Sequence, residues 1–446
     1  MSSVILSVDI GTTSLKSAFI DFDGKLKAFS RFAYPMGSAA AVWEKVFALV
    51  LEDLHSAMPG VKIDGVCVSG NGPTLVPLNR EGGALPPLYW FEGVEKTAAK
   101  SLFLPHVMYF KEKEPSQYEN TALFVSSHEW LAHRLGADMF TALPHEEYLP
   151  YYWDEEQCAL CGLDIKKFPP FKKMGSLAGK VSAAAAGLYG FLGLKSGIPI
   201  IVGAPDFISA LIGTGVLKNG DVCDRAGSSE GINFCACAEE KTSGESAGFK
   251  NLRVLPHVKK GFYNIGSLIP VSGRLFESYR ICTNQESRSY EALLEEQIPM
   301  EFDTRLFQLD SALTPGIYND KTAIGRSVLC AIGFSVRGAV ETLESQGFPV
   351  KVMRVSGGQG KNPLWNQLKA DISGVSLLIP EICDGELAGN AVLAACALEN
   401  PSDVDFERVL DAAASRMIRF REEYSPRAET AQFWEERYRM ANNEEL

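Results

Sequence analysis

The chain has 446 residues, of which 46% are hydrophobic and 22% are charged, a globular composition with room for about two or three domains. Its formal net charge of −12 argues against a nucleic-acid-binding protein, which would present a basic face, and against docking on anionic membranes. The negative net charge does not exclude anionic small ligands, because a phosphate site needs only backbone N–H donors and at most a lysine.

The first half of the chain is predicted to mix strands and helices. Apolar runs, alternation and the turn signal Asp23-Gly24 predict a β-meander at its start. Apolar residues at helical spacing follow it. The predicted elements are strands at 4–8, 15–22 and 25–34, a helix at 39–57, strands at 61–69 and 75–78, a helix at 129–135, a strand at 198–202 and a helix at 207–213.

The second half repeats the order strand, polar turn, strand after Gly220, which predicts a domain boundary there, with domains at 1–218 and 219–446. The predicted elements are strands at 221–226 and 232–236, a long helix at 323–345, a strand at 350–355, a helix at 363–372, a strand at 377–379, a helix at 385–398 and a charged helical region at about 406–440 over an outer surface. The start of the chain shows no cleavable signal, and its apolar runs are too short to span a bilayer, so a cytoplasmic location is expected.

The turn at 9–16 is the first candidate binding element. A glycine between two strands lets the backbone approach a ligand closely, and hydroxyl and backbone N–H donors suit phosphate oxygens. Asp9, at the end of a strand, could hold Mg²⁺ through water. The alternative is a plain β-hairpin with ordinary turn residues. The candidate phosphate ligands are Gly11, Thr12, Thr13, Ser14 and Lys16.

Two further polar turns follow in the second half. Gly227, Ser228 and Ser229 lie between two strands, and a hairpin from each domain could hold a phosphate chain from both sides. Glycines after a strand and before a helix suit a backbone packed against a flat group such as adenosine. Asn362 precedes Pro363 at the expected start of a helix, so it is either a helix cap or a nucleotide ligand. The candidate nucleotide ligands of this last turn are Gly357, Gly358, Gln359 and Asn362.

These turns, in this order, resemble the FGGY family of carbohydrate kinases over roughly residues 4 to 400. The family's opening Asp-x-Gly-Thr-Thr-Ser, its Gly-Gly-x-Asp, its second-domain Gly-Thr-Ser and its Ser-Gly-Gly-Gly before Pro-Leu-Trp are matched at 9–16, 203–206, 227–229 and 356–365. The resemblance implies an α/β fold of two actin-like (ribonuclease H-like) domains with a central cleft. It also implies that the first domain binds the sugar and the second the nucleotide.

The resemblance also implies a reaction, in which Mg-ATP phosphorylates a hydroxyl of a sugar, sugar acid or polyol. Asp206 matches the family's catalytic aspartate and would accept the proton of the attacking hydroxyl. The alternative role for Asp206 is an N-cap of the helix that follows, and the two roles are compatible because a helix N-terminus stabilises a carboxylate.

The substrate residues that the resemblance implies are Asn71, Gly72, Trp90, Glu92 and Asp206. Trp90 would stack on a sugar face, or else lie in the core, and Glu92 would bind hydroxyls. The expected partners are therefore a small sugar or polyol, ATP and Mg²⁺, without nucleic acid or membrane. The oligomeric state stays open, a homodimer included.

The chain also departs from the family pattern. Gly72 and Pro73 stand where xylulose kinases carry Met-His, and Val94 stands where an arginine is expected. Glu230 occupies a position of the second phosphate turn where a small residue is usual, and a carboxylate facing phosphate would be unfavourable unless it points away. The region 277–323 is short compared with the family pattern. These departures keep a second hypothesis, a non-catalytic FGGY-like protein that binds nucleotide or sugar. An actin-like chaperone or filament protein is disfavoured, because it would lack the Pro-Leu-Trp turn.

Overall fold

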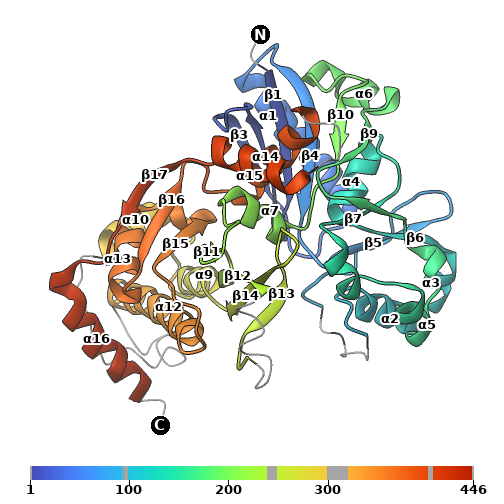
Figure 1. The fold of residues 1–446 in the computed structure, drawn as a ribbon. Helices are drawn as coiled ribbons and strands as arrows, with labels where there is room; N and C mark the ends of the chain where they lie inside the picture. The colour runs from blue at the N-terminus through green and yellow to red at the C-terminus, as the bar shows by residue number, and fades with distance from the viewer. Residues whose placement is uncertain are drawn as a thin grey trace. The chain divides into compact units, whose positions relative to one another are not determined.

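A computed structural model describes residues 3–92, 94, 99–238, 249–298, 320–399 and 405–443 (Figure 1). The chain forms two compact units: unit 1 holds Met1–Gly215, Val258–Lys260 and Gly385–Arg419, and unit 2 holds Val216–His257, Gly261–Asp384 and Phe420–Leu446. The sequence predicts one change of domain near Gly220, whereas the chain returns to unit 1 for Gly385–Arg419. Part of residues 277–323, namely 299–319, lies outside the described residues.

Unit 1 contains a six-stranded sheet of order β3-β2-β1-β4-β10-β9. Strand β1 pairs antiparallel with β2, which pairs antiparallel with β3, so the predicted opening meander is confirmed. On its other side β1 runs parallel to β4. The sheet strands are β1 Ser3–Ile10, β2 Ser14–Ile20, β3 Leu26–Ala33, β4 Lys62–Gly70, β9 Leu177–Lys180 and β10 Pro199–Ile201.

Helices cover this sheet, and smaller strand pairs accompany it. The helices of unit 1 are α1 Ala40–Ala57, α2 Leu104–Lys113, α3 Pro115–Asn120, α4 Ser127–Leu135, α5 Glu155–Leu160, α6 Ala183–Tyr189, α7 Asp206–Gly213, α14 Gly385–Glu399 and α15 Phe406–Met417. The strand pairs are β5 Leu75–Asn79 with β6 Thr121–Ser126, and β7 Thr141–Leu143 with β8 Phe171–Lys173.

Strand β1 shows why polar residues gather on one face of this sheet. Successive side chains of a strand point to opposite faces. Val4, Leu6 and Val8 join the core cluster that contains residues of α1 and α4. Ser7 lies on the opposite face, where its hydroxyl donates to the carbonyl of Leu387 in α14 at 2.8 Å. Asp9 therefore points to the α14 side, and Figure 1 shows α14, far along the chain, beside β1 and β4.

Helices α7 and α14 cross at close range because glycines lie at the crossing. A Cβ on Gly213 would lie 1.9 Å from the carbonyl oxygen of Gly385, and a Cβ on Gly389 would lie 1.9 Å from that of Ser209. No larger residue fits either position without moving a backbone. This contact fixes α7, whose first residue is Asp206.

Unit 2 contains a seven-stranded sheet of order β13-β14-β12-β11-β15-β16-β17. Strands β11 and β12 form the second predicted strand–turn–strand, which is confirmed. The strands are β11 Val222–Ala226, β12 Glu230–Cys237, β13 Arg253–Pro256, β14 Phe262–Ile269, β15 Val352–Ser356, β16 Ser376–Pro380 and β17 Phe420–Tyr424. The helices are α9 Gly273–Cys282, α10 Tyr290–Gln297, α12 Lys321–Glu344, α13 Pro363–Ser373 and α16 Ala428–Asn443.

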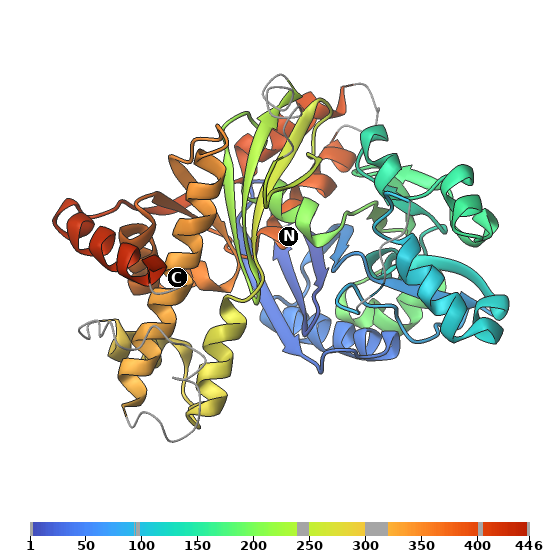
Figure 2. The same ribbon diagram turned by 90° about the horizontal axis from the view of Figure 1, so that it is seen from below.

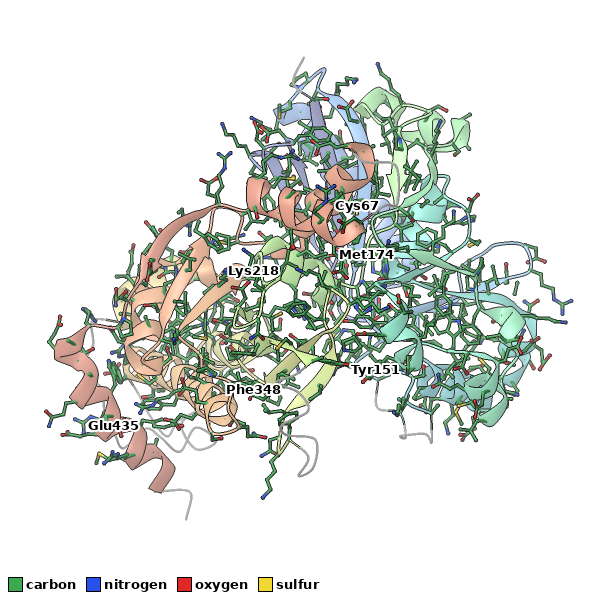
Figure 3. All side chains as sticks on the ribbon, in the orientation of Figure 1. Cys67, Tyr151, Met174, Lys218, Phe348 and Glu435 are labelled. Atoms are coloured by element: carbon green, nitrogen blue, oxygen red, sulfur yellow. The ribbon has the colours of Figure 1, made fainter. Side chains whose placement is uncertain are left out.

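Helix α12 is the central helix of unit 2. One side packs against β12 and β14 with Val336, Val340 and Leu343, and Phe348 joins the same core (Figures 2 and 3). By length and composition alone, the helix could cross a membrane. Most of its apolar stretch is buried inside the protein, however, as in a core helix.

The predicted helical region at about 406–440 is interrupted by a strand, so that prediction is wrong in part. The apolar stripe of α15 ends at Met417, and the next residues alternate and pair antiparallel with β16 as β17. Pro426 then stops the strand, since proline has no N–H to donate to a ladder. Only the last segment, α16, returns to a helix.

Candidate active site

The first polar turn directs its carbonyl groups inward. The Gly11 N–H donates to the carbonyl of Ser14 at 2.9 Å, and the Tyr34 hydroxyl donates to the carbonyl of Gly11 at 2.6 Å. The hydroxyl of Ser14 is buried and accepts from Arg31 Nε at 3.1 Å, so this side chain is engaged between β2 and β3. Thr13 lies at the surface and Gly11 and Thr12 are half-buried, so the outer side of the turn is partly accessible.

A buried relay of hydrogen bonds orients Asp9. Its Oδ1 accepts from the Ser69 hydroxyl at 2.8 Å, and Ser69 in turn accepts from Asn390 Nδ2 at 2.9 Å. Asn390 also donates to the carbonyl of Val8 at 2.9 Å and accepts from the Ser209 hydroxyl at 3.0 Å. Figure 3 shows the neighbouring Cys67 beside α14. The relay joins β1, β4, α7 and α14, and it engages Oδ1 of Asp9 rather than Oδ2.

Lys16 and Glu386 complete the charges around Asp9. Lys16 Nζ lies 3.8 Å from Asp9 Oδ2 and 3.8 Å from Glu386 Oε2. Burial raises the pKa of Asp9 to about 7; Lys16 opposes this rise, and the charges of Glu386 and Asp206 add to it. The candidate base, Asp206, therefore acts electrostatically on the candidate metal ligand, Asp9.

This raised pKa predicts a pH effect on the ligand-free protein. In the unfolded chain Asp9 loses its proton near pH 3.8, whereas the folded protein keeps it until about pH 7. The contribution of Asp9 to stability is therefore fully present below pH 4 and lost as the pH rises to about 7. The wild type should therefore lose stability between pH 5 and pH 8 while Asp9→Asn does not. We expect the free energy of unfolding of Asp9→Asn, relative to the wild type, to rise by up to about 3 kcal/mol over this range, which is several degrees in melting temperature. Thermal melts without magnesium at both pH values test this, and an unchanged difference between the proteins would contradict it.

Asp206 begins α7 and is held next to the end of β4. Gly70 and Pro205 form an isolated parallel bridge, which fixes the residue before Asp206 against that strand. The Phe207 N–H donates to Asp206 Oδ1 at 2.6 Å. The N-cap is Pro205, so the predicted N-cap role of Asp206 is wrong by one position. Its carboxylate still lies in the first turn, where the helix dipole favours the ionised form.

Asn71 and its neighbours form the wall next to Asp206. The Ser127 hydroxyl, at the start of α4, donates to Asn71 Oδ1 at 3.3 Å, which turns Nδ2 of Asn71 toward Thr12 Oγ1 at 3.4 Å. Gly70 makes this approach feasible, because a Cβ there would lie 2.3 Å from the Ser127 hydroxyl. The sequence gives no local sign of Ser127, whose role depends on a contact across 56 residues.

Trp90 lies beside the first polar turn. Its indole Nε1 donates to Thr12 Oγ1 at 3.0 Å, and 37% of the residue is exposed, so the alternative of a core tryptophan is wrong. Gly72 is exposed close to Pro205. Glu92 is half-buried, and burial raises its pKa. The neighbouring Gly93 lies outside the described residues. The structure thus brings Thr12, Asn71 and Trp90 together.

The second polar turn, at 227–229, belongs to unit 2, and its carbonyls are also bonded inward. The carbonyl of Gly227 accepts from the Gly273 N–H at 3.2 Å, and that of Ser228 accepts from the Arg274 N–H at 3.0 Å. Gly227 and Ser228 are exposed and Ser229 is half-buried. Glu230 is buried and pairs with Lys369 of α13, so its carboxylate points away from the turn surface. The unfavourable approach of Glu230 to phosphate is therefore avoided.

The third turn requires glycine at its first position. Gly357 has a φ of +105°, and a Cβ there would lie 2.3 Å from the carbonyl oxygen of Ala226. Gly358 is exposed, as a surface for a flat ligand would be. Asn362 Oδ1 accepts from the Trp365 N–H at 3.0 Å, so its predicted cap role is confirmed. The side chain of Gln359 is bonded within unit 2, to the carbonyl of Gly227 among others.

Solved structures share this fold. A gluconate kinase from Lactobacillus acidophilus superimposes with a TM-score of 0.76 at 16% identity, covering 99% of this chain and 97% of that one. A Plasmodium falciparum glycerol kinase with ADP superimposes with a TM-score of 0.75 at 16% identity, covering 100% and 98%. The expected α/β fold with two actin-like domains is confirmed.

Sequence comparisons identify the family. Residues 95–213 match the N-terminal domain and residues 305–398 the C-terminal domain of the FGGY family of carbohydrate kinases. The xylulose kinase of Bacillus subtilis (strain 168) is 23% identical over an alignment of 504 residues, covering 98% of this chain and 96% of that protein. Both family models match in chain order, and the relative aligns over nearly its whole length, so the chain belongs to the FGGY family of carbohydrate kinases.

Proposed function

We propose that this carbohydrate kinase transfers the γ-phosphoryl group of ATP to a hydroxyl of a small sugar or polyol, with Asp206 as the general base. The observation that carries the proposal is the group of charges in unit 1, where Asp206 acts on the pKa of Asp9 and starts α7 beside the end of β4. Phosphoryl transfer depends mainly on positioning and on neutralising charge, which such a group can supply.

Asp206 is suited to accept a proton from a hydroxyl. Its Oδ1 is held by the Phe207 N–H at 2.6 Å, so the carboxylate has a fixed orientation. The residue is half-buried and can reach a bound substrate. Asn71 and Trp90, on the neighbouring wall, are proposed to orient the sugar through its hydroxyls and one ring face, with Gly72 and Glu92 at the margin.

Asp9 fits a magnesium ion that enters with ATP. Mg²⁺ takes one or two carboxylates and keeps several waters, and Oδ2 of Asp9 faces a cation, Lys16, at 3.8 Å. When bound, the ion offsets the charge on the phosphoryl oxygens. The relay through Ser69 holds Asp9 in place for this role, and Lys16 is proposed to contact phosphate.

We propose that the remaining ATP contacts come from exposed turns. In unit 1 these are Gly11, Thr12 and Thr13, with Ser14 supporting them from within. In unit 2 we propose that the turn at 227–229 contacts phosphate and that Gly357 and Gly358 lie along the nucleoside, next to Asn362, which caps α13. The domain roles predicted for 1–218 and 219–446 are proposals of the same kind, as is a cytoplasmic location, where ATP is supplied.

An ADP-release assay with Mg-ATP over a panel of ketoses, aldoses, polyols and sugar acids tests the proposed reaction. We expect turnover well above the ATP hydrolysis measured without acceptor for at least one neutral member of the panel. No turnover across the panel, with ATP still raising the melting temperature, would overturn phosphoryl transfer. A nucleotide-binding protein without activity would then be the better description.

A further inference from the structure

Three ionisable side chains are buried together beneath the second phosphate turn. Lys369 Nζ of α13 lies 2.9 Å from Asp224 Oδ2 of β11 and 2.5 Å from Glu230 Oε1 of β12. The side chains are at most 1% exposed. Glu230 is thus anchored at the base of the turn rather than at its surface.

A hydrogen-bond chain continues from Glu230 to the third turn. The Ser272 hydroxyl donates to Glu230 Oε2 at 2.5 Å, and Gln359 Nε2 lies 3.0 Å from Ser272 Oγ. The same amide nitrogen donates to the carbonyl of Gly227 at 3.2 Å and lies 3.4 Å from Glu230 Oε2. Gln359 Oε1 accepts from Trp365 Nε1 at 3.0 Å, which fixes which end of the amide faces the turn.

The two ends of this chain are positions where the sequence departs from the family pattern. Glu230 stands where a small residue is usual, and Gln359 stands where the pattern has its third glycine. A lone carboxylate at Glu230 would be costly, and a lone glutamine at Gln359 would only crowd the turn. Because Ser272 connects the two side chains, we interpret both departures as parts of one hydrogen-bonded arrangement.

We propose that Gln359 is a positioning residue for the nucleotide, whose amide ties the third turn to the carbonyl of Gly227 and, through Ser272, to the anchored Glu230. This inference rests on the proposed function, because it takes the two turns to be ATP contacts. Binding of the nucleoside to one turn then pre-orders the phosphate turn, which lowers the entropic cost of binding the whole nucleotide.

The test is calorimetric binding of ADP, which needs no knowledge of the sugar. Gln359→Met keeps the side-chain length and removes the hydrogen bonds, and we expect ADP to bind about fivefold to tenfold more weakly. Gln359→Glu cannot donate to Gly227 and approaches Glu230, so it should bind at least as weakly as Gln359→Met. Gln432→Met, the same change at an exposed site on α16, is the matched control and should bind like the wild type.

Further readouts separate positioning from general loss of structure. With a sugar that is accepted, the KM for ATP should rise while the KM for the sugar and the melting temperature stay near the wild-type values. Should Gln359→Met not fold, Ser272→Ala removes the shortest of the contacts of Gln359 Nε2 and should weaken ADP binding in the same direction, by a smaller factor. Unchanged ADP affinity in these variants overturns the inference alone, whereas a wild-type protein that binds no ADP overturns the proposed function with it.

Discussion

Replacing Asp206 with asparagine is expected to lower kcat for the accepted sugar by about a hundredfold to ten-thousandfold, the range that a positioned general base supplies. Asparagine keeps the size of the side chain, and its amide oxygen can still accept from the Phe207 N–H. The fold and the sugar affinity should therefore be preserved. The loss is then confined to the step in which the hydroxyl gives up its proton.

The measurements are steady-state kinetics with saturating Mg-ATP, sugar binding by calorimetry and a thermal melt for each protein. Asp138→Asn is the matched control, because Asp138 is an exposed carboxylate of unit 1 that pairs with Lys172 at 3.0 Å. It should retain wild-type turnover. An Asp206→Asn variant with kcat within about tenfold of the wild type would remove Asp206 from the role of base.

The elements that the sequence predicts well carry a local signal. Apolar runs, alternation and a Gly turn predict β1, β2 and β3, and helical spacing predicts α12, because these patterns can be recognised from residues close together in the sequence. Local signals also locate each polar turn. They fail for β17, a short edge strand of charged and aromatic residues that follows an amphipathic helix and pairs with β16, a separate segment of the chain.

The residues that sequence reasoning missed act across long separations. Asn390 bonds to Val8, 382 residues earlier, and Lys369 bonds to Asp224, 145 residues earlier. Glu386 and Asn390 do leave one trace, as polar residues in a helix otherwise built of small apolar ones. Burying such a polar residue costs free energy unless a hydrogen-bonding partner lies within reach. A polar interruption of a buried helix is thus the signal that could have marked these positions.

The cost of burying a polar group without its partner also predicts the largest effect on stability, which we expect at Lys369. Glu230 is the ionised partner of Lys369: burial alone would raise the pKa of Glu230, but Lys369 together with the hydrogen bonds to Asp224 and Ser272 outweighs burial and lowers that pKa. Burial and the charge of Glu230 raise the pKa of Asp224, so Asp224 is the acid that holds its proton more strongly. Removing the lysine therefore leaves a buried charge without its counter-ion.

We expect Lys369→Met to lose about 3–5 kcal/mol of stability, a fall in melting temperature on the order of 10 °C for the transition of unit 2. Lys351→Met, at an exposed position before β15, is the control and should melt like the wild type. Adding Glu230→Gln to Lys369→Met should recover part of the loss, because it removes the uncompensated charge. Recovery would show that the ion pair stabilises unit 2 chiefly by neutralising Glu230. A single variant that melts with the wild type would instead mean that water or another group already compensates that charge.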